Sequence, residues 1–113
     1  MDIKRGDVYL VALDPVLGRE ISKTRPAVIV SNNKNNAFSG TVTVVPLSSQ
    51  NLEKIYPFEV LLPEGSGNLP KDSKTKADQI RTLDRARIIK YIGSLAGSEM
   101  KEIDQAIRLH LEL

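Results

Sequence analysis

The stretch KTRPAVIVSN, residues 23–32, decides how this chain folds and where its chemistry lies. Pro26 fixes its own φ angle and favours an extended backbone at Arg25. Residues 27–30 are apolar and mostly β-branched, which predicts a strand buried on both faces, and the polar pair 31–32 ends that strand. An arginine with little backbone freedom thus lies at the open end of a core strand, where it is suited to meet an anion. The alternative is an arginine that caps the strand or pairs with a carboxylate.

Length and composition predict a single domain over residues 1–113, with a core built from Val, Ile and Leu because 41% of the residues are hydrophobic and Trp is absent. The absence of cysteine excludes disulfides, thiolate metal sites and a Cys nucleophile, and it fits a reducing compartment. With one histidine, His110, the chain cannot build a His-based metal cluster or a Ser-His-Asp triad. We interpret His110 as a helix-end residue favoured by the helix dipole rather than as a catalyst. No signal peptide or membrane span is visible, so we expect a cytoplasmic protein.

The net charge of +2 conceals an uneven distribution. Residues 71–90 carry seven Lys or Arg against three Asp, whereas residues 99–112 carry four acidic against two basic residues. A basic segment of this kind is typical of a polyanion-binding face. The alternative is that the basic and acidic segments simply pack next to each other.

Short β-rich segments separated by turn residues predict a mostly β fold with one C-terminal helix. Pro46 indicates an edge or a bulge in the third strand. In the helix, Ser98 is the expected N-cap with Glu99 in the first turn. Apolar residues then recur at helical spacing, which predicts that the helix packs across one opening of the sheet. The expected strands are residues 7–13, 27–30, 41–47, 57–62, 73–80 and 88–95, with helical turns within 32–39 and 83–87, and the apolar helix positions are Met100, Ile103, Ala106, Ile107 and Leu111.

Four blocks, in order and over almost the whole chain, resemble the MazF/PemK-type endoribonuclease toxins, also called mRNA interferases. The blocks are KRGDVY (4–9); Asp14-Pro15 with Gly18 and Glu20, running into TRPAVIV (24–30); VVPLS (44–48); and ADQIRTLD (77–84). The resemblance implies a compact SH3-like barrel of mainly antiparallel strands with a C-terminal helix, and a homodimer. It also implies cleavage of single-stranded RNA at short motifs without a metal or cofactor: the 2′-hydroxyl attacks the adjacent phosphate and leaves a 2′,3′-cyclic phosphate and a 5′-hydroxyl. A cognate MazE-like antitoxin, with an acidic flexible tail, is expected to compete with RNA.

The resemblance places the family's catalytic arginine at Arg25 and its catalytic Thr or Ser at Ser48, with Ser49 as an adjacent alternative. Guanidinium binds phosphate oxygens bidentately and stays charged, so we expect Arg25 to stabilise the pentavalent phosphorane electrostatically rather than to donate a proton. A hydroxyl at Ser48 is suited to bind a phosphate oxygen or orient the 2′-hydroxyl. The alternative for Ser48 is a serine that caps a loop.

The general base is the least determined role. Asp78 matches the aspartate proposed as base in some PemK-like members, and Glu20 is a second candidate. Those members carry Arg where this chain has Lys76, and His where it has Arg19, so their acid–base set is not intact here. Either carboxylate is equally consistent with a solvated or structural group.

Further residues are candidates for RNA contact. Gln79 and Arg81 match family positions, although Arg81 is equally consistent with a local ion pair to Asp84. Lys54 and Tyr56 share one loop, where a cation and an aromatic ring suit phosphate contact and base stacking. With Arg19 and Lys76 they complete the predicted RNA-binding set.

Two other functions remain open on the sequence alone. A CcdB-like toxin that binds a protein such as gyrase shares this kind of barrel but has no use for the pair Arg25 and Ser48. A plain RNA-binding barrel would bind RNA without cleaving it. Fold by itself does not separate these alternatives.

Overall fold

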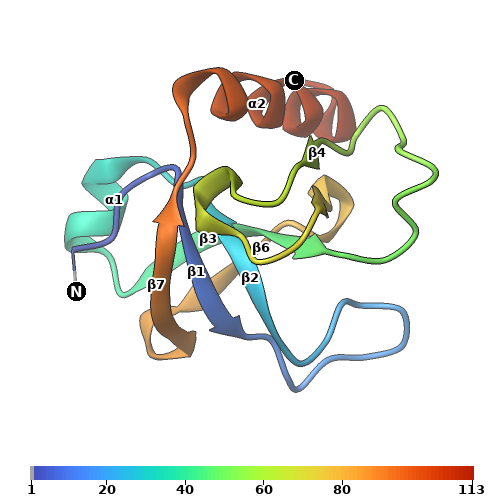
Figure 1. Ribbon diagram of the computed structural model, residues 1–113. Coiled ribbons are helices and arrows are strands. Elements are labelled where there is room, and N and C mark those ends of the chain that lie inside the picture. Colours follow the sequence, from blue (N-terminus) through green and yellow to red (C-terminus); the bar gives the residue numbers. More distant parts are fainter. Residues whose placement is uncertain (1) are drawn as a thin grey trace.

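The protein is described here over residues 2–113, in a computed structural model. A curled antiparallel sheet forms a half-barrel, and one long helix lies across it (Figure 1). The strands are β1 (Asp7–Ala12), β2 (Thr24–Ile29), β3 (Thr41–Ser48), β4 (Leu61–Leu62), β5 (Ser73–Thr75), β6 (Arg81–Asp84) and β7 (Ile88–Ser94). The α-helices are α1 (Asn33–Phe38) and α2 (Gly97–Leu111), and three short 3₁₀ helices are η1 (Ser66–Asn68), η2 (Ala77–Gln79) and η3 (Arg85–Arg87). The predicted mostly β fold with a C-terminal helix is confirmed.

The strands follow the order β4-β5-β3-β2-β1-β7, and β6 pairs with the first half of β3. All of the pairings are antiparallel. The curl brings η1 against β7, where the Asn68 side-chain amide donates to the Ile92 carbonyl (3.1 Å). Glycine is required at this contact, because a Cβ on Gly93 would lie 2.3 Å from the Gly67 carbonyl oxygen. The close contact between the backbones of η1 and β7 thus holds the two sides of the curled sheet together.

The core has two parts, one on each face of the sheet, because successive residues of a strand point to opposite faces. Ala27 and Ile29 belong to the first part, inside the curl, while Val28 belongs to the second, beneath α2. This explains why the run 27–30 is apolar at every position, and the predicted burial on both faces is confirmed for residues 27–29. The strand begins earlier than predicted, at Thr24, so Arg25 and Pro26 lie inside it.

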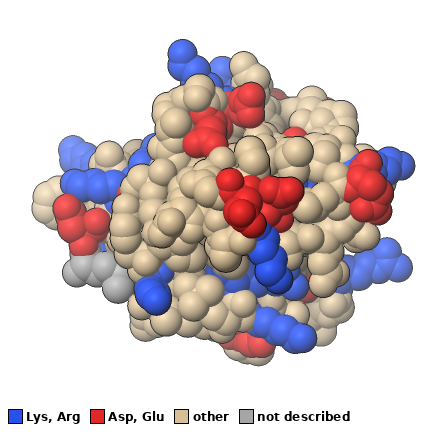
Figure 2. Space-filling view, viewed as in Figure 1, with Lys and Arg blue, Asp and Glu red and all other residues tan. Residues whose placement is uncertain are grey.

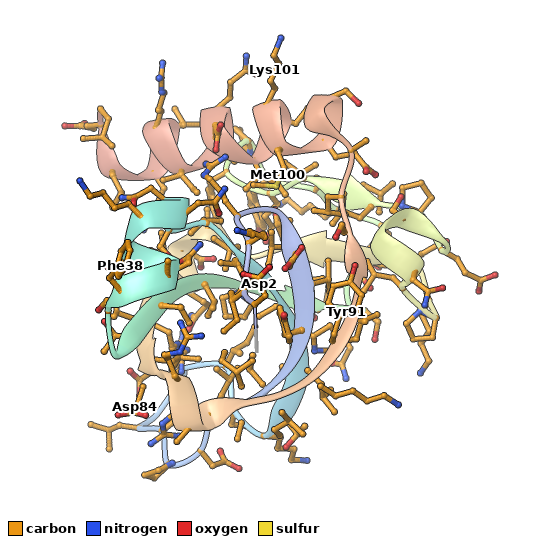
Figure 3. All side chains as sticks on the ribbon, turned by 90° about the vertical axis from the view of Figure 1, so that its left-hand side faces the viewer. Asp2, Phe38, Asp84, Tyr91, Met100 and Lys101 are labelled. Carbon is orange, nitrogen blue, oxygen red and sulfur yellow. The ribbon has the colours of Figure 1, made fainter. Side chains whose placement is uncertain are left out.

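Helix α2 covers the second part of the core with Met100, Ile103 and Ala106. Met100 points from the helix toward the sheet and Lys101 points away from it (Figure 3). The prediction of Ser98 as N-cap is wrong: the N-cap lies two residues earlier, at Ala96, whose N–H donates to the Glu99 carboxylate (2.8 Å). Leu111 was also predicted on the buried side but is exposed, since the buried residues of the helix are Met100, Ile103 and Ala106, and the last turn adds none.

Pro46 does not mark an edge, since β3 is an interior strand. It lies where the neighbour of β3 changes, because β6 pairs with residues 41–44 and β5 with residues 47–48. The missing N–H of proline therefore falls at a break between partners and costs no ladder bond.

Two predicted strands are shorter than expected. Of residues 57–62, Leu61–Leu62 alone form β4, because the Glu59 N–H donates to the Tyr56 carbonyl (2.8 Å) and closes a turn. Of residues 73–80, β5 takes Ser73–Thr75 and the chain then coils into η2, which buries Ala77 under α2. No helix within residues 2–113 is long and apolar enough to cross a membrane.

Candidate active site

Arg25 of β2 and Ser48 of β3 lie at the same open end of the sheet. In the register of β2 with β3, Ala27 lies opposite Pro46. The ladder between the two strands ends at this pair, and Arg25 and Ser48 each lie two residues beyond it on neighbouring strands. Arg25 alternates with Ala27, which belongs to the first part of the core. The strand ends carry the loops 13–23 and 49–60, which both project from the right-hand side of Figure 1.

Arg25 is held by one hydrogen bond and keeps its terminal nitrogens available. The side chain is half-buried, and its Nε donates to the Ser22 carbonyl (2.8 Å). Its two terminal nitrogens form no hydrogen bond or ion pair with residues 2–113, so Arg25 does not pair with a carboxylate of the described chain. A guanidinium fixed in this way presents its fork outward, which suits a phosphate.

Ser48 and Ser49 are the two hydroxyls at this end of β3. The Ser48 Oγ accepts a hydrogen bond from the Gln50 N–H (3.2 Å), which is the contact of a loop-capping serine, and its own proton has no acceptor within residues 2–113. Ser49, and not Ser48, lines a pocket of about 280 Å³ together with Arg25, Pro26 and Leu47. Ser49 is therefore the serine that shares this pocket with Arg25, whereas the family resemblance assigns the catalytic hydroxyl to Ser48.

Gln79 and Arg81 fasten η2 to the loop that carries Ser22. The Gln79 Oε1 accepts hydrogen bonds from the Ile21 N–H (3.1 Å) and from Arg81 Nη2 (3.1 Å). The alternative ion pair between Arg81 and Asp84 is absent from the described residues, because the Asp84 carboxylate caps η3 at the Ala86 N–H (2.8 Å). Gln79 and Arg81 therefore shape the site as well as lying near it.

The two carboxylates considered for the general base are both exposed and both engaged locally. The Glu20 Oε1 accepts a hydrogen bond from the Leu17 N–H (2.5 Å). Asp78 lies 3.8 Å from Lys76 Nζ. No contact of the described residues joins either carboxylate to Arg25. Arg19 is exposed in the same loop as Glu20 and has no hydrogen bond or ion pair with residues 2–113.

Lys54 and Tyr56 start a row of stacked groups that runs toward α2. Lys54 Nζ lies 4.9 Å from the Tyr56 ring centre, and the Tyr56 and Phe58 rings are stacked, with centres 5.6 Å apart and planes 7° from parallel. His110, in the last turn of α2, follows at 6.0 Å from Phe58. The single histidine therefore packs against the row at the helix end.

Sequence reasoning missed a buried charge cluster formed by Glu59, Lys74 and Lys76. The Glu59 side chain is 0% exposed, Lys74 is 5% exposed and Lys76 is 20% exposed. Lys74 Nζ lies 3.2 Å from Glu59 Oε1, and Lys76 Nζ donates to Glu59 Oε2 (2.6 Å). One signal was available in the sequence. Lys74 and Lys76 are two residues apart in a predicted strand, so they lie on the same face, and two neighbouring ammonium groups there favour a carboxylate partner.

Hydrogen bonding decides the protonation of Glu59. Burial raises the pKa of its carboxyl, but hydrogen bonds from Lys76, the Tyr56 N–H and Lys74 outweigh burial and hold that pKa below its usual value. Glu59 is therefore ionised at neutral pH, and it neutralises one of the two ammonium groups that it contacts, of which Lys74 is buried and Lys76 is partly exposed.

The expectation that segment 71–90 forms a basic face stays a prediction, and most of its cations also have bonds within the molecule. Lysines and arginines are scattered around the side shown in Figure 2, with acidic groups between them. Long cationic side chains pack their stems on apolar surface and bond backbone carbonyls, and here they fasten loops. Five of the seven basic residues are bonded within the molecule: Lys74 and Lys76 to Glu59, Arg81 to Gln79, Arg85 to the Asn36 carbonyl and Arg87 to the Asp14 carbonyl.

The fold and this site define the class of the protein, and comparison with known proteins agrees. A family model described as the PemK-like, MazF-like toxin of type II toxin–antitoxin systems matches residues 4–111. The chain therefore belongs to this toxin family, as its sequence motifs predicted.

Particular relatives make the likeness sharper. The endoribonuclease MazF9 of Mycobacterium tuberculosis is 41% identical over 98% of both chains. The crystal structure of MazF from Deinococcus radiodurans is 26% identical, with a TM-score of 0.86 over 100% of this chain and 99% of that one. An endoribonuclease from a mycobacterial species, solved with its cognate antitoxin, is 26% identical, with a TM-score of 0.77 over 99% of this chain and 95% of that one. These similarities give no support to the alternative of a CcdB-like toxin that binds a protein target.

Proposed function

We propose that the chain cuts single-stranded RNA, mRNA in particular, at a short sequence motif, through attack of a ribose 2′-hydroxyl on the adjacent phosphate. The products carry 2′,3′-cyclic phosphate and 5′-hydroxyl ends. By its family the chain is the toxin of a type II toxin–antitoxin pair and an endoribonuclease. The observation that carries the chemical proposal is the Arg25 guanidinium, whose terminal nitrogens are unpaired in the described chain and which lies at a strand end next to that of Ser48.

The reaction needs a group that stabilises the negative charge of the phosphorane. Arg25 fits this need, because a fixed cation that requires no reorganisation stabilises charge as it develops in the transition state. Its high intrinsic pKa of about 12.5–13.8 makes proton donation unfavourable, so the proposed role is electrostatic. For the Ser48 hydroxyl, whose proton has no acceptor within residues 2–113, the proposed role is to donate a hydrogen bond to a phosphate oxygen.

Glu20 and Asp78 are the two proposed candidates for the general base that takes the 2′-hydroxyl proton. Glu20 belongs to the loop whose Ser22 carbonyl holds Arg25, and Asp78 belongs to η2, whose Gln79 side chain bonds that same loop. Both carboxylates are exposed. A general base must be exposed in this way to reach the ribose of a bound RNA. All groups of the proposed mechanism come from the chain and from RNA, and it requires no cofactor.

RNA contact is proposed for exposed side chains on the two loops. Arg19 in the first loop and Lys54 with Tyr56 in the second supply charge and a stacking surface. Lys76, Gln79 and Arg81 are bonded within the molecule, so their proposed contribution to RNA binding is mainly to shape the site.

The proposed partners are RNA, a second copy of this chain, and a cognate antitoxin with an acidic flexible tail that occupies the RNA site. A structurally similar endoribonuclease was solved with its cognate antitoxin, which supports the last of these. Cytoplasmic RNA is the proposed target, which makes the cytoplasm the proposed location.

The test is incubation of the purified protein with a long single-stranded RNA in EDTA, followed by analysis of fragment ends. We expect discrete fragments with 2′,3′-cyclic phosphate and 5′-hydroxyl ends, and none with the Arg25→Ala variant. Two unrelated RNAs left intact by the wild type would contradict the proposal and favour a protein target. RNA that is bound but never cut would favour a binding barrel.

A further inference from the structure

The long loop between β3 and β4, residues 49–60, contains no helix or strand. Loops of this length without regular structure are uncommon in compact domains and often serve function. Here the loop carries Lys54 and Tyr56, which the proposed function assigns to RNA contact. A free loop would lose conformational entropy on binding RNA, so contacts that hold the loop in place beforehand would strengthen binding.

Lys74 holds this loop from beneath. An ammonium group has three N–H donors. Those of Lys74 have three acceptors: the Asn51 carbonyl (3.0 Å), the Lys54 carbonyl (3.2 Å) and Glu59 Oε1 (3.2 Å). All three acceptors lie in residues 51–59, so the buried Lys74 ammonium group links three points of the loop.

Glu59 completes the attachment from the loop's own end. Its Oε1 accepts a hydrogen bond from the Tyr56 N–H (2.9 Å), and its Oε2 accepts one from Lys76 (2.6 Å). The backbone atoms fixed by the pair therefore include the carbonyl of Lys54 and the N–H of Tyr56. Asn51 adopts a left-handed backbone (φ 54°), which asparagine tolerates, and so turns its carbonyl into reach of Lys74.

The same lysine also lies beside the catalytic strand end, because Lys74 of β5 is directly opposite Ser48 of β3. One buried cation is thus adjacent to the proposed catalytic hydroxyl and bonded to the proposed RNA-contacting loop. Lys74 thus connects the strand end at Ser48 with the backbone of the loop 49–60.

We propose that Lys74 and Glu59 are positioning residues, which fix the backbone at Lys54 and Tyr56 so that the two side chains meet RNA preorganised beside Ser48. This inference rests on the proposed function. Neither residue touches RNA: they act through the loop. Substitution of Lys74 is therefore expected to weaken RNA binding and raise KM, and to leave the rate of the chemical step nearly unchanged.

The test compares steady-state cleavage by wild type, Lys74→Met, Lys74→Arg and Glu59→Gln, with Lys101→Met as control, since Lys101 points away from the sheet (Figure 3). Misplacing one stacking residue should raise KM about 5- to 100-fold in Lys74→Met, while kcat stays within about twofold. Lys74→Arg should recover part of the loss, and Lys101→Met should equal wild type. Hydrogen exchange should quicken in the peptide covering residues 49–60 of Lys74→Met.

A double-mutant cycle shows whether Lys74 acts through the loop. In a Lys54→Ala/Tyr56→Ala background, Lys74→Met should raise KM little further. Additive effects, or a KM equal to wild type in a folded Lys74→Met, would overturn the inference while leaving the proposed function standing. If Lys74→Met does not fold, the same KM-against-kcat comparison on Glu59→Gln decides. A wild type that neither binds nor cuts RNA would overturn the proposed function, and the inference with it.

Discussion

Arg25 owes its character to its immediate neighbours. Pro26 restricts its backbone, the strand keeps it extended, and the Ser22 carbonyl binds Nε while leaving the terminal nitrogens unpaired within the described chain. A guanidinium that is already oriented loses less entropy on meeting phosphate than a free one. At this scale, the site depends on which side of a strand each residue faces.

The two adjacent serines provide a prediction at the same scale. Because the family motif assigns the catalytic hydroxyl to Ser48, Ser48→Ala should lower kcat about 10- to 100-fold. Ser49→Ala, at the serine that lines the Arg25 pocket, should lower kcat less. Single-turnover cleavage of one RNA by each variant measures this. A larger loss in Ser49→Ala than in Ser48→Ala would show that the motif assigns the wrong serine.

Glu59 provides a prediction about pH. Its folded-state pKa is lowered, so the stability that it contributes is present above its unfolded pKa of about 4.3 and is lost as pH falls through that value toward the folded pKa. Glu59→Gln should cost about 1–3 kcal/mol of unfolding free energy at pH 7, because both lysines lose a charged acceptor. The difference from wild type should shrink as the pH falls below about 4.3. Urea unfolding at pH 7 and near pH 3.5 checks this, and a constant difference would contradict the assigned role of the carboxylate.

At the scale of elements, the sequence predicted most strands and the C-terminal helix, because binary pattern and turn residues act locally. The pair Arg25 and Ser48 stays a prediction, made from the family resemblance. It could not predict where a strand gives way to a turn. Residues 57–60 have strand-like composition but fold as a turn held by Glu59, and residues 77–79 alternate like a strand but coil so that Ala77 is buried under α2. Long-range contacts decided both cases. The alternation of Lys74 and Lys76 indicated a carboxylate partner, but the sequence did not show that Lys74 also bonds the backbone of the loop.

The closure of the half-barrel provides a prediction for the contact of η1 with β7. A Cβ at position 93 would approach the Gly67 carbonyl to 2.3 Å, and backbone does not move aside cheaply. Gly93→Ala should therefore lose about 1–3 kcal/mol of unfolding free energy in denaturant. Gly97→Ala is the matched control, since its Cβ would enter open space at the start of α2, and it should be neutral or gain up to about 1 kcal/mol. Equal stability of the two variants would contradict the proposed closure.

At the scale of the whole molecule, several of the lysine and arginine side chains form hydrogen bonds and ion pairs that stabilise the fold. Of the basic residues assigned to RNA, Lys76 is bonded to Glu59 and Arg81 to Gln79, which leaves Arg19, Arg25 and Lys54 to meet phosphates. Three neutralised phosphates on a single strand correspond to a slope of log K against log[salt] of about −2. Binding of a short uncut RNA across a salt series tests this, and a slope steeper than about −4 would indicate a broad basic face instead.

The most direct test of the central claim separates RNA binding from RNA cleavage at Arg25. Arg25→Ala and, as control, Arg108→Ala on the exposed side of α2 are compared for cleavage rate and for affinity toward one RNA. If Arg25 stabilises the phosphorane, Arg25→Ala should cleave at least about 100-fold more slowly than wild type, with an affinity within a few-fold, and Arg108→Ala should match wild type. An Arg25→Ala variant that still cuts RNA at nearly the wild-type rate would contradict the account, because its catalytic cation would have to lie elsewhere.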